Sequence, residues 1–166
     1  MQLFSRSSLV KANLEALAQN WRFERGVTLV LDYPAGFALE VLPMLEPPVV
    51  IVTPSLSPYY WQNLIDHGPS ALLTEPAAIE AALTKAATGQ PGSFPAVPAD
   101  QRLTPREREV LGLLVKGMSD KEIARELGLE PKTVSHWVLN IRGKMGAENR
   151  AQAILIYWGL LPGLTV

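Results

Sequence analysis

The chain has 166 residues, of which 48% are hydrophobic and 19% charged, and its formal net charge at pH 7 is −1. This length and composition fit a protein of two compact domains, each large enough for its own core. The absence of cysteine excludes disulfide bonds, thiolate catalysis and cysteine-ligated zinc. With neither a signal peptide nor an apolar run long enough to cross a bilayer, a cytoplasmic location without membrane contact is expected.

Residues 1–88 alternate between short β-rich runs and helical runs. The expected strands are 1–4, 27–31, 49–52 and 71–73, and the expected helices are 9–18, 38–45, 61–66 and 77–87. Such alternation predicts an α/β domain, in which a parallel sheet carries helices on its faces.

A stretch rich in proline and glycine follows this domain. Residues 89–98 contain three prolines and two glycines and have no hydrophobic periodicity. We therefore predict that residues 89–101 form an interdomain linker, which its prolines make a semi-stiff spacer.

Two capping motifs open the C-terminal region, residues 102–166. Thr104 is followed three residues later by Glu107, and Ser119 by Glu122. In such a capping box the hydroxyl accepts from an open backbone amide at the helix start, and the glutamate reaches back to the cap residue. Two helices are therefore predicted to begin after these caps, the second of them ending at a turn at Gly128.

The next helix is predicted to open near Pro131 and to have two different faces. One face is apolar, with spacings of four, three and four residues, and comprises Val134, Val138, Ile141 and Met145. The other face combines positive, hydrogen-bonding and small apolar groups, which suit a DNA groove, and comprises Lys132, Ser135, His136, Leu139 and Arg142. A last helix is predicted to open at Asn149.

Charge is distributed unevenly between the two regions. Residues 102–166 hold 10 Lys and Arg against 7 Asp and Glu, a net of +3, whereas residues 1–101 hold 5 against 9, a net of −4. A modestly basic module that binds DNA releases counterions, so its affinity is expected to fall steeply with salt.

Residues 103–161 resemble the four-helix DNA-binding domain of transcription regulators of the LuxR, NarL and FixJ type. The resemblance rests on the string at 103–111, on Glu122-Ile123-Ala124 with Leu127-Gly128, on Thr133-Val134, and on the residues from Asn140 to Ala151. It implies that the third helix lies in the major groove. The residues that it implies for DNA contact are Ser135, His136 and Leu139 for bases, Lys132, Thr133, Lys144 and Arg150 for phosphates, and Arg106 and Asn140 beside them.

Two departures affect what the resemblance implies about specificity. Ser135 stands where a lysine is frequent, and Trp137 replaces a usual histidine. The sequence preference of family members therefore does not transfer directly. The alternative interpretation of the whole region is a packed helical unit used for protein contact, with an ordinary solvated face.

The N-terminal region resembles the receiver domain of response regulators, a flavodoxin-like fold. The resemblance rests on Leu29-Val30-Leu31-Asp32 with Pro34 and Gly36, on residues 49–53, on residues 68–76, and on the order of receiver, linker and helix-turn-helix. Between residues 18 and 27 the chain is too short for a full helix and strand. One of the usual five strand-helix units is therefore expected to be shortened or lost.

A working receiver needs a phosphoacceptor aspartate, an acidic pair for magnesium, a Thr or Ser and a lysine. The chain keeps Asp32 and Thr53, but Ser5 and Arg6 replace the acidic pair, and Glu75 stands where the lysine would precede Pro76. Without acidic ligands a magnesium ion has little to coordinate it, so neither a metal nor another cofactor is expected. We hypothesise a pseudo-receiver in which Arg6 pairs with Asp32 in place of metal and lysine. The alternative is that Asp32 caps a turn at the strand end.

These features predict a sequence-specific transcriptional regulator that is independent of phosphorylation and is not an enzyme. A homodimer is expected, because one recognition helix covers only a few base pairs. The candidate dimer contacts are Ile154, Tyr157 and Trp158 of the last helix, although Trp158 fits packing against the first helix equally well. The expected partners are double-stranded DNA, a second copy and RNA polymerase, and no small-molecule substrate is evident. Two alternatives remain: a conventional response regulator phosphorylated on Asp32, and a protein-interaction module without DNA binding.

Overall fold

The computed structural model describes residues 1–23 and 26–162 and divides into two compact units. The first unit comprises residues 1–56 and 64–96, and the second comprises residues 57–63 and those from 97 onward. The sequence pattern predicts one domain over residues 1–88, whereas the structure groups residues 57–63 with the C-terminal helices. The predicted linker is shared between the units, since residues 89–96 belong to the first and 97–101 to the second.

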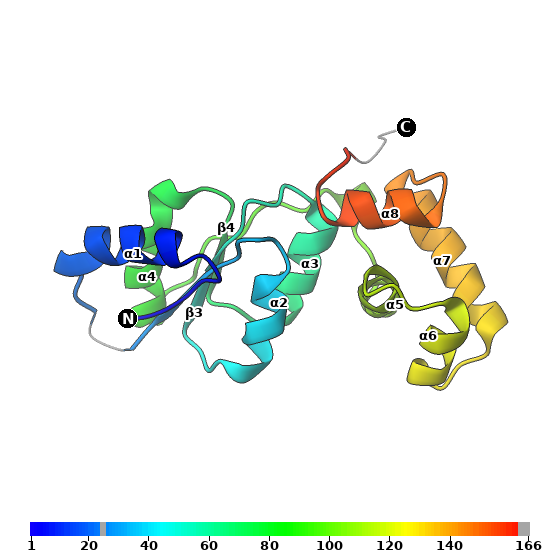
Figure 1. Cartoon of the computed structure of the whole chain (residues 1–166), viewed down its shortest axis with the longest axis horizontal. Coiled ribbons are helices and arrows are strands. Elements are labelled where there is room, and N and C mark those ends of the chain that lie inside the picture. Colours follow the sequence, from blue (N-terminus) through cyan, green and yellow to red (C-terminus); the bar gives the residue numbers. More distant parts are fainter. Residues whose placement is uncertain (24–25, 163–166) are drawn as a thin grey trace. The chain divides into compact units, whose positions relative to one another are not determined.

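The first unit is built on a four-stranded parallel sheet (Figure 1). Its strands are β1 (Gln2–Phe4), β2 (Thr28–Leu31), β3 (Val49–Val52) and β4 (Ala71–Leu73), in the spatial order β1-β2-β3-β4. The register places Val30 beside Phe4 on one neighbouring strand and beside Ile51 on the other. All four residues of β2 are buried, as is typical of a parallel strand with both faces covered. The predicted parallel α/β fold is confirmed.

The sheet also bears out the expected loss of a strand-helix unit. Helix α1 (Ser8–Leu17) is followed by a single 3₁₀ turn, η1 (Ala18–Asn20), before β2 begins. The part of this connection that the structure describes contains no strand, so every strand neighbours the next one in sequence. The sheet therefore has four strands where a receiver has five.

Helices α1 and α4 (Ile79–Ala87) pack on the same face of the sheet (Figure 1). Alternate strand residues point to this face, among them Leu29, Leu31 and Val50, which are buried against Leu83. The two helices contribute unequally: α4 buries five of its residues, whereas none of α1 is fully buried. Helix α2 (Phe37–Val41) and the turns η2 (Leu42–Met44) and η3 (Pro76–Ala78) complete the connections of this unit.

Part of the predicted linker is fixed to the sheet. The backbone amide of Leu72 in β4 donates a hydrogen bond of 3.0 Å to the carbonyl oxygen of Ser93. A Cβ atom added at Gly92 would lie 1.8 Å from the carbonyl oxygen of Ser70, so only glycine allows this approach. Residues 92–93 are therefore anchored on the first unit.

The second unit contains the helices that the caps predict. They are α5 (Pro105–Val115), α6 (Asp120–Leu127), α7 (Pro131–Met145) and α8 (Arg150–Tyr157). Both capping boxes are present in full, at Thr104 with Glu107 and at Ser119 with Glu122. Gly128 ends α6 with a left-handed φ of 65°, which a side chain disfavours. The side chain of Asn149 caps α8 by accepting from the amide of Gln152 at 2.9 Å.

Residues 57–63 also belong to the second unit and include most of α3 (Pro58–Asp66). The turn η4 (Ala99–Gln101) precedes α5. The side chain of Gln62 bonds to the backbone between this turn and α5: its Nε2 donates to Gln101 O at 3.0 Å, and its Oε1 accepts from Leu103 N at 2.9 Å. The start of the helical unit is thereby fixed.

The core of the second unit lies where α5, α6, α7 and α8 meet. The predicted apolar face of α7 is confirmed, since Val134, Val138, Ile141 and Met145 are at most 7% exposed. On α5, Val110, Leu111 and Leu114 are wholly buried, and Ile123 of α6 lies beside them in the core. Leu127, the last residue of α6, is only half-buried. Most of the stability of these short helices comes from this shared apolar packing.

We predict that Leu111→Ala lowers the free energy of unfolding of the helical unit by about 2–5 kcal/mol, because it leaves a cavity in the core. Leu139→Ala is the matched control: the same side chain on α7 is 59% exposed, so its loss should change stability by no more than about 0.5 kcal/mol. Denaturant unfolding measures both. Equal losses for the two variants would contradict this assignment of the core.

Candidate nucleic-acid interface

The face of α7 opposite the core is open to solvent. Because Val134, Val138, Ile141 and Met145 turn inward, the residues between them turn outward. Those predicted to contact DNA and found exposed on α7 are Lys132, Thr133, Ser135, His136, Leu139, Asn140 and Lys144. Although Leu139 is apolar, 59% of its surface is exposed to solvent. The predicted recognition face is therefore a real surface of the second unit.

The beginning of α7 has no capping side chain. Its cap residue, Glu130, makes no side-chain hydrogen bond to the helix start, and Pro131 occupies the first position. The positive end of the helix dipole is therefore not satisfied by a capping side chain. Lys132 stands in this first turn and its ammonium has no hydrogen-bond or ion-pair partner among the described residues. A phosphate oxygen placed here would meet both the dipole and the ammonium.

His136 and Asn140 form a polar pair in the middle of the exposed face. The Nε2 atom of His136 and the Nδ2 atom of Asn140 lie 3.4 Å apart, one helical turn from each other. Beside them, Leu139 offers methyl groups. Amide and imidazole groups bond to base edges and methyl groups contact thymine, so the three together have the chemistry of base readout.

Two other predicted phosphate contacts, Lys144 and Arg150, and the predicted DNA contact Arg106 are engaged within the unit. Lys144 Nζ lies 2.8 Å from Glu107 Oε2, and Arg150 Nη1 lies 2.7 Å from Asp120 Oδ1. Arg106 pairs with Glu109 and stacks over the ring of Trp137, its guanidinium carbon 5.3 Å from the ring centre. Their cationic groups hold helices together, and their expected roles at phosphates remain predictions.

Asp120 is a structural residue that the sequence pattern did not single out. Its Oδ2 accepts from the hydroxyl of Ser135 at 2.6 Å, while its Oδ1 accepts from Arg150. One carboxylate thus ties α6 to α7 and α8. Burial raises the pKa of Asp120, but the hydrogen bonds from Ser135 and Arg150 outweigh it and hold the pKa below its ordinary value. The only signal in the sequence is an acidic residue in the first turn of α6.

This tie alters the role expected of Ser135. Its hydroxyl hydrogen is directed to Asp120, and the oxygen also lies 3.1 Å from the carbonyl of Pro131. The side chain therefore reaches a base only as an acceptor unless Asp120 releases it.

Glu107 performs a similar structural function between α5 and α7. Its Oε2 accepts from the Thr104 amide at 2.7 Å and from the Thr104 hydroxyl at 2.9 Å, in addition to Lys144. Burial raises the pKa of Glu107, but the bonds from Lys144 and Thr104 together lower it below the ordinary value of 4.5. The capping glutamate that the sequence predicts thus also anchors the end of the recognition helix.

The second predicted site, around Asp32, differs from the hypothesis. Asp32 is fully buried at the end of β2, and its Oδ1 accepts from the backbone amides of Gly36 at 3.1 Å and Ala38 at 2.8 Å. Its Oδ2 accepts from the hydroxyl of Thr53 at 2.7 Å. Asp32 therefore caps the turn that leads into α2, and the alternative interpretation of this residue is confirmed.

The predicted pairing of Arg6 with Asp32 is wrong. Arg6 instead forms an ion pair with Glu40 and lies over the ring of Phe37, with its guanidinium carbon 5.7 Å from the ring centre. The side chains of Arg6 and Glu40 are more than half exposed, so this pair avoids the large desolvation penalty of bringing a guanidinium to a buried carboxylate.

The remaining residues of the predicted pseudo-phosphoacceptor pocket do not converge on Asp32. The hydroxyl of Ser5 bonds locally with the backbone of Ser7. Glu75 is exposed and makes no hydrogen bond or ion pair with another described residue. Across residues 1–23 and 26–162, no three histidine or acidic side chains are grouped so as to hold a metal ion. Of the five residues predicted here, the structure joins only Asp32 and Thr53.

The predicted dimer contacts on α8 divide into buried and accessible residues. Tyr157 is wholly buried within the second unit: its ring packs edge-on against Tyr60, 5.5 Å between centres, and its hydroxyl accepts from Asn63 at 2.8 Å. A side chain with no exposed surface cannot contact a second copy, so the prediction for Tyr157 is wrong. Ile154 and Trp158 are partly exposed and remain candidates.

No helix in the described part of the chain has the length and hydropathy to span a bilayer.

We predict that Glu107→Gln makes the helical unit less stable above pH 5 and flattens its acid unfolding. The folded-state pKa of Glu107 is lowered, so its stabilising contribution is complete above the ordinary pKa of 4.5 and is lost as pH falls through the lower folded value. Thermal unfolding from pH 3 to 7 measures this. Glu126→Gln, which changes an exposed glutamate of α6, serves as the control and should follow the parent protein. Parallel profiles for Glu107→Gln and the parent would contradict the role given to Glu107.

Comparison with known proteins agrees with this geometry. The family described as "Bacterial regulatory proteins, luxR family" matches residues 101–157. Spore germination protein GerE of Bacillus subtilis (strain 168) is 47% identical over 53 residues, which are 32% of this chain and 72% of GerE. The methanol utilization control regulatory protein MoxX of Paracoccus denitrificans is 28% identical over 165 residues, covering 81% of this chain and 72% of MoxX.

Most of the chain also resembles a solved structure, that of RcsB from Salmonella enterica serovar Typhimurium bound to promoter rprA. The TM-score is 0.50 with 18% identity, over 89% of this chain and 80% of RcsB, which shows a shared fold. The chain spans 37% of the length of one curated relative that it matches and 63% of another. The N-terminal unit has a receiver-like parallel α/β fold, and the chain belongs to the luxR family of bacterial regulatory proteins.

Proposed function

We propose that this protein regulates transcription by placing α7 in the major groove of duplex DNA, that it does so as a homodimer, and that it needs no phosphoryl transfer to Asp32. The observation that carries the proposal is the division of α7 into a buried apolar face and an exposed face bearing His136, Leu139 and Asn140. An exposed leucine between two hydrogen-bonding side chains suits a groove that offers both methyl groups and base edges.

Contacts to phosphates begin at the N-terminal turn of α7. There the ammonium of Lys132 and the uncapped helix start both attract an anion, and the hydroxyl of Thr133 is exposed beside them. These groups carry no information on sequence, so they supply position and affinity. His136, Leu139 and Asn140 supply the preference for particular bases.

A dimer is the natural unit for this mode of binding. A single recognition helix reads few base pairs, and a two-fold pair of helices reads two half-sites one helical turn apart. Of the three predicted contact residues, Ile154 on α8 and Trp158 at its C-terminal end keep accessible surface and are the proposed contacts. A contact with RNA polymerase stays a prediction.

The environment of Asp32 supports the proposed independence from phosphorylation. Its carboxylate is fully buried and accepts hydrogen bonds from Gly36, Ala38 and Thr53. Phosphoryl transfer requires an accessible oxygen, a metal ion to neutralise charge, and a cation on the phosphoryl group. At the corresponding positions this chain has Ser5, Arg6 and Glu75, so the metal ligands and the lysine are both missing.

We predict that Lys132→Ala weakens binding to all duplexes by a similar factor and lowers the slope of log affinity against log salt by about 1, because one phosphate contact is lost. His136→Ala should instead change the ranking among duplexes, by about 1–3 kcal/mol at the bases it reads. Fluorescence anisotropy with duplexes selected from genomic fragments, at several salt concentrations, measures both effects.

Lys85→Ala is the control for this experiment. Lys85 is an exposed lysine of α4, in the first unit, and its removal should leave affinity and salt slope unchanged. Similar effects of Lys132→Ala and His136→Ala on every duplex would refute the division of roles. No salt-sensitive affinity in the parent protein would favour the interaction module without DNA binding.

We predict that acetyl phosphate with Mg²⁺ leaves Asp32 unmodified, as intact mass measures. We expect Asp32→Asn to destabilise the first unit by about 1–3 kcal/mol, because the amide replaces one acceptor oxygen by a donor among groups that donate. DNA affinity at a temperature where the variant is folded should match that of the parent. Magnesium-dependent acyl phosphate on Asp32 would instead establish a conventional response regulator.

A further inference from the structure

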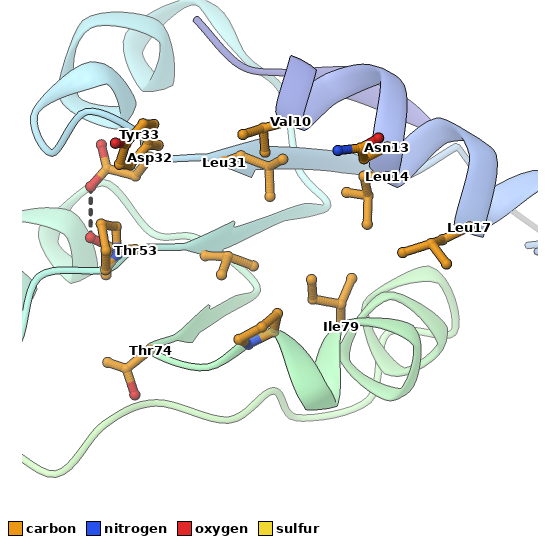
Figure 2. Close-up of a pocket in the computed structure, with 13 residues that line it drawn as sticks. Val10, Asn13, Leu14, Leu17, Leu31, Asp32, Tyr33, Thr53, Thr74 and Ile79 are labelled. Carbon is orange, nitrogen blue, oxygen red and sulfur yellow. Dashed lines mark hydrogen bonds between the residues drawn. The ribbon is translucent and has the colours of Figure 1, made fainter. Parts of the chain in front are cut away.

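A cavity of about 420 Å³ lies in the first unit, between α1 and the carboxyl ends of β2, β3 and β4 (Figure 2). Val10 and Leu14 of α1 face Leu31 of β2 and Ile79 of α4 across it. Its volume falls in the range of small-molecule sites in proteins, which is roughly 300–1,000 Å³. The cavity is therefore large enough to hold an organic molecule of two or three rings.

The walls of the cavity are mostly apolar, and their polar groups lie mainly at the strand ends, apart from Asn13 on α1 (Figure 2). The apolar lining residues are Val10, Leu14, Leu17, Leu31, Val52, Pro54, Pro76 and Ile79. At the strand ends Tyr33 and Thr74 present accessible polar groups, beside the buried hydrogen-bonded pair of Asp32 and Thr53 (Figure 2). An apolar wall with a few polar groups at one end orients a ligand and gives it specificity.

The location is the one at which parallel α/β sheets bind their ligands, outside the carboxyl ends of the strands. Phosphate chemistry does not suit this cavity, because no lysine, arginine or histidine lines it. Its one formal charge is the buried carboxylate of Asp32, which disfavours an anion. The charge of the walls therefore restricts the ligand to a neutral or cationic molecule.

Helix α1 closes the cavity loosely. None of its residues is fully buried, and Leu17, at the edge of the cavity, is 72% exposed, with Val10 at 37%. A ligand under α1 would cover apolar surface that the chain leaves open to water, and the burial of this surface would favour binding. Apolar side chains at the edge of a preformed cavity thus favour occupation by an apolar molecule.

We propose that this cavity is a binding site for a neutral or cationic, largely apolar small molecule that directs a hydrogen-bonding group toward the strand ends. The site does not depend on the DNA-binding proposal. It replaces the phosphoryl chemistry of a receiver with molecular recognition at the same end of the sheet, and it lies wholly among described residues of the first unit.

Two fluorescent probes with the same ring system test the class of ligand. N-phenyl-1-naphthylamine is neutral and has one N–H donor, and 8-anilino-1-naphthalenesulfonate adds a sulfonate to the same rings. Titrated into the full chain, the neutral probe should bind saturably at one site, and the sulfonate should bind about tenfold more weakly or not at all. Equal affinity for the two probes, or no saturable binding of the neutral one, would overturn the proposal.

Two leucines of the same helix provide a matched pair of variants. Leu17 lines the cavity and is 72% exposed, whereas Leu9 is 71% exposed and does not line it. Leu17→Glu should weaken the neutral probe about tenfold, because a carboxylate replaces an apolar contact at the rim. Leu9→Glu should leave its affinity unchanged. Both side chains are largely exposed, so circular dichroism and thermal unfolding should show that both variants fold like the parent.

The other possible occupant of this face is a second copy of the chain, and light scattering distinguishes it. If Leu17→Glu abolished a concentration-dependent dimer while probe binding stayed the same, the face would be an interface and the small-molecule proposal would fail. Equal loss of probe affinity in Leu9→Glu and Leu17→Glu would likewise place the probe on the outside of α1.

Discussion

The burial of one face of α7 is the constraint on which the second unit depends. Val134, Val138, Ile141 and Met145 insert into the core formed with α5, α6 and α8, and this fixes the rotation of the helix about its own axis. Because the rotation is fixed, His136, Leu139 and Asn140 lie on the solvent-exposed face of the helix. A rotation of one residue, about 100°, would bury polar groups without partners and expose the apolar row, at a large cost in free energy.

Two carboxylates add precision to this packing. Glu107 joins the start of α5 to Lys144 near the end of α7, and Asp120 joins the start of α6 to Ser135 and Arg150. Each acid sits in the first turn of its helix, where it also offsets the unsatisfied amides and the positive dipole. The apolar core fixes the rotation of α7 about its axis. The hydrogen bonds and ion pairs of the two carboxylates link α7 and its neighbouring helices to one another.

The sequence was informative where a local pattern determines a local structure. Capping boxes at Thr104 and Ser119 located two helix starts correctly, because each box is formed within four residues. Side-chain pairing over long distances was not predictable in the same way. Arg6 meets Glu40, 34 residues away, and Asp120 meets Arg150, 30 residues away, and such partners depend on tertiary positions that no local pattern encodes. The cavity beneath α1 was missed for a related reason: a leucine or valine facing a cavity looks the same in sequence as one facing a core.

The receiver-like unit keeps the parallel sheet of a phosphorylated domain but uses its strand ends differently, with Asp32 as a turn cap. In the other unit, the exposed face of α7 is proposed to enter the major groove. The most direct measurement is of intermolecular nuclear Overhauser effects between the methyl groups of Leu139 and the protons of a bound duplex. Contacts from these methyls to thymine methyl or other major-groove protons are expected. Unperturbed Leu139 methyls in a complex whose shifts change only on other helices would contradict the claim.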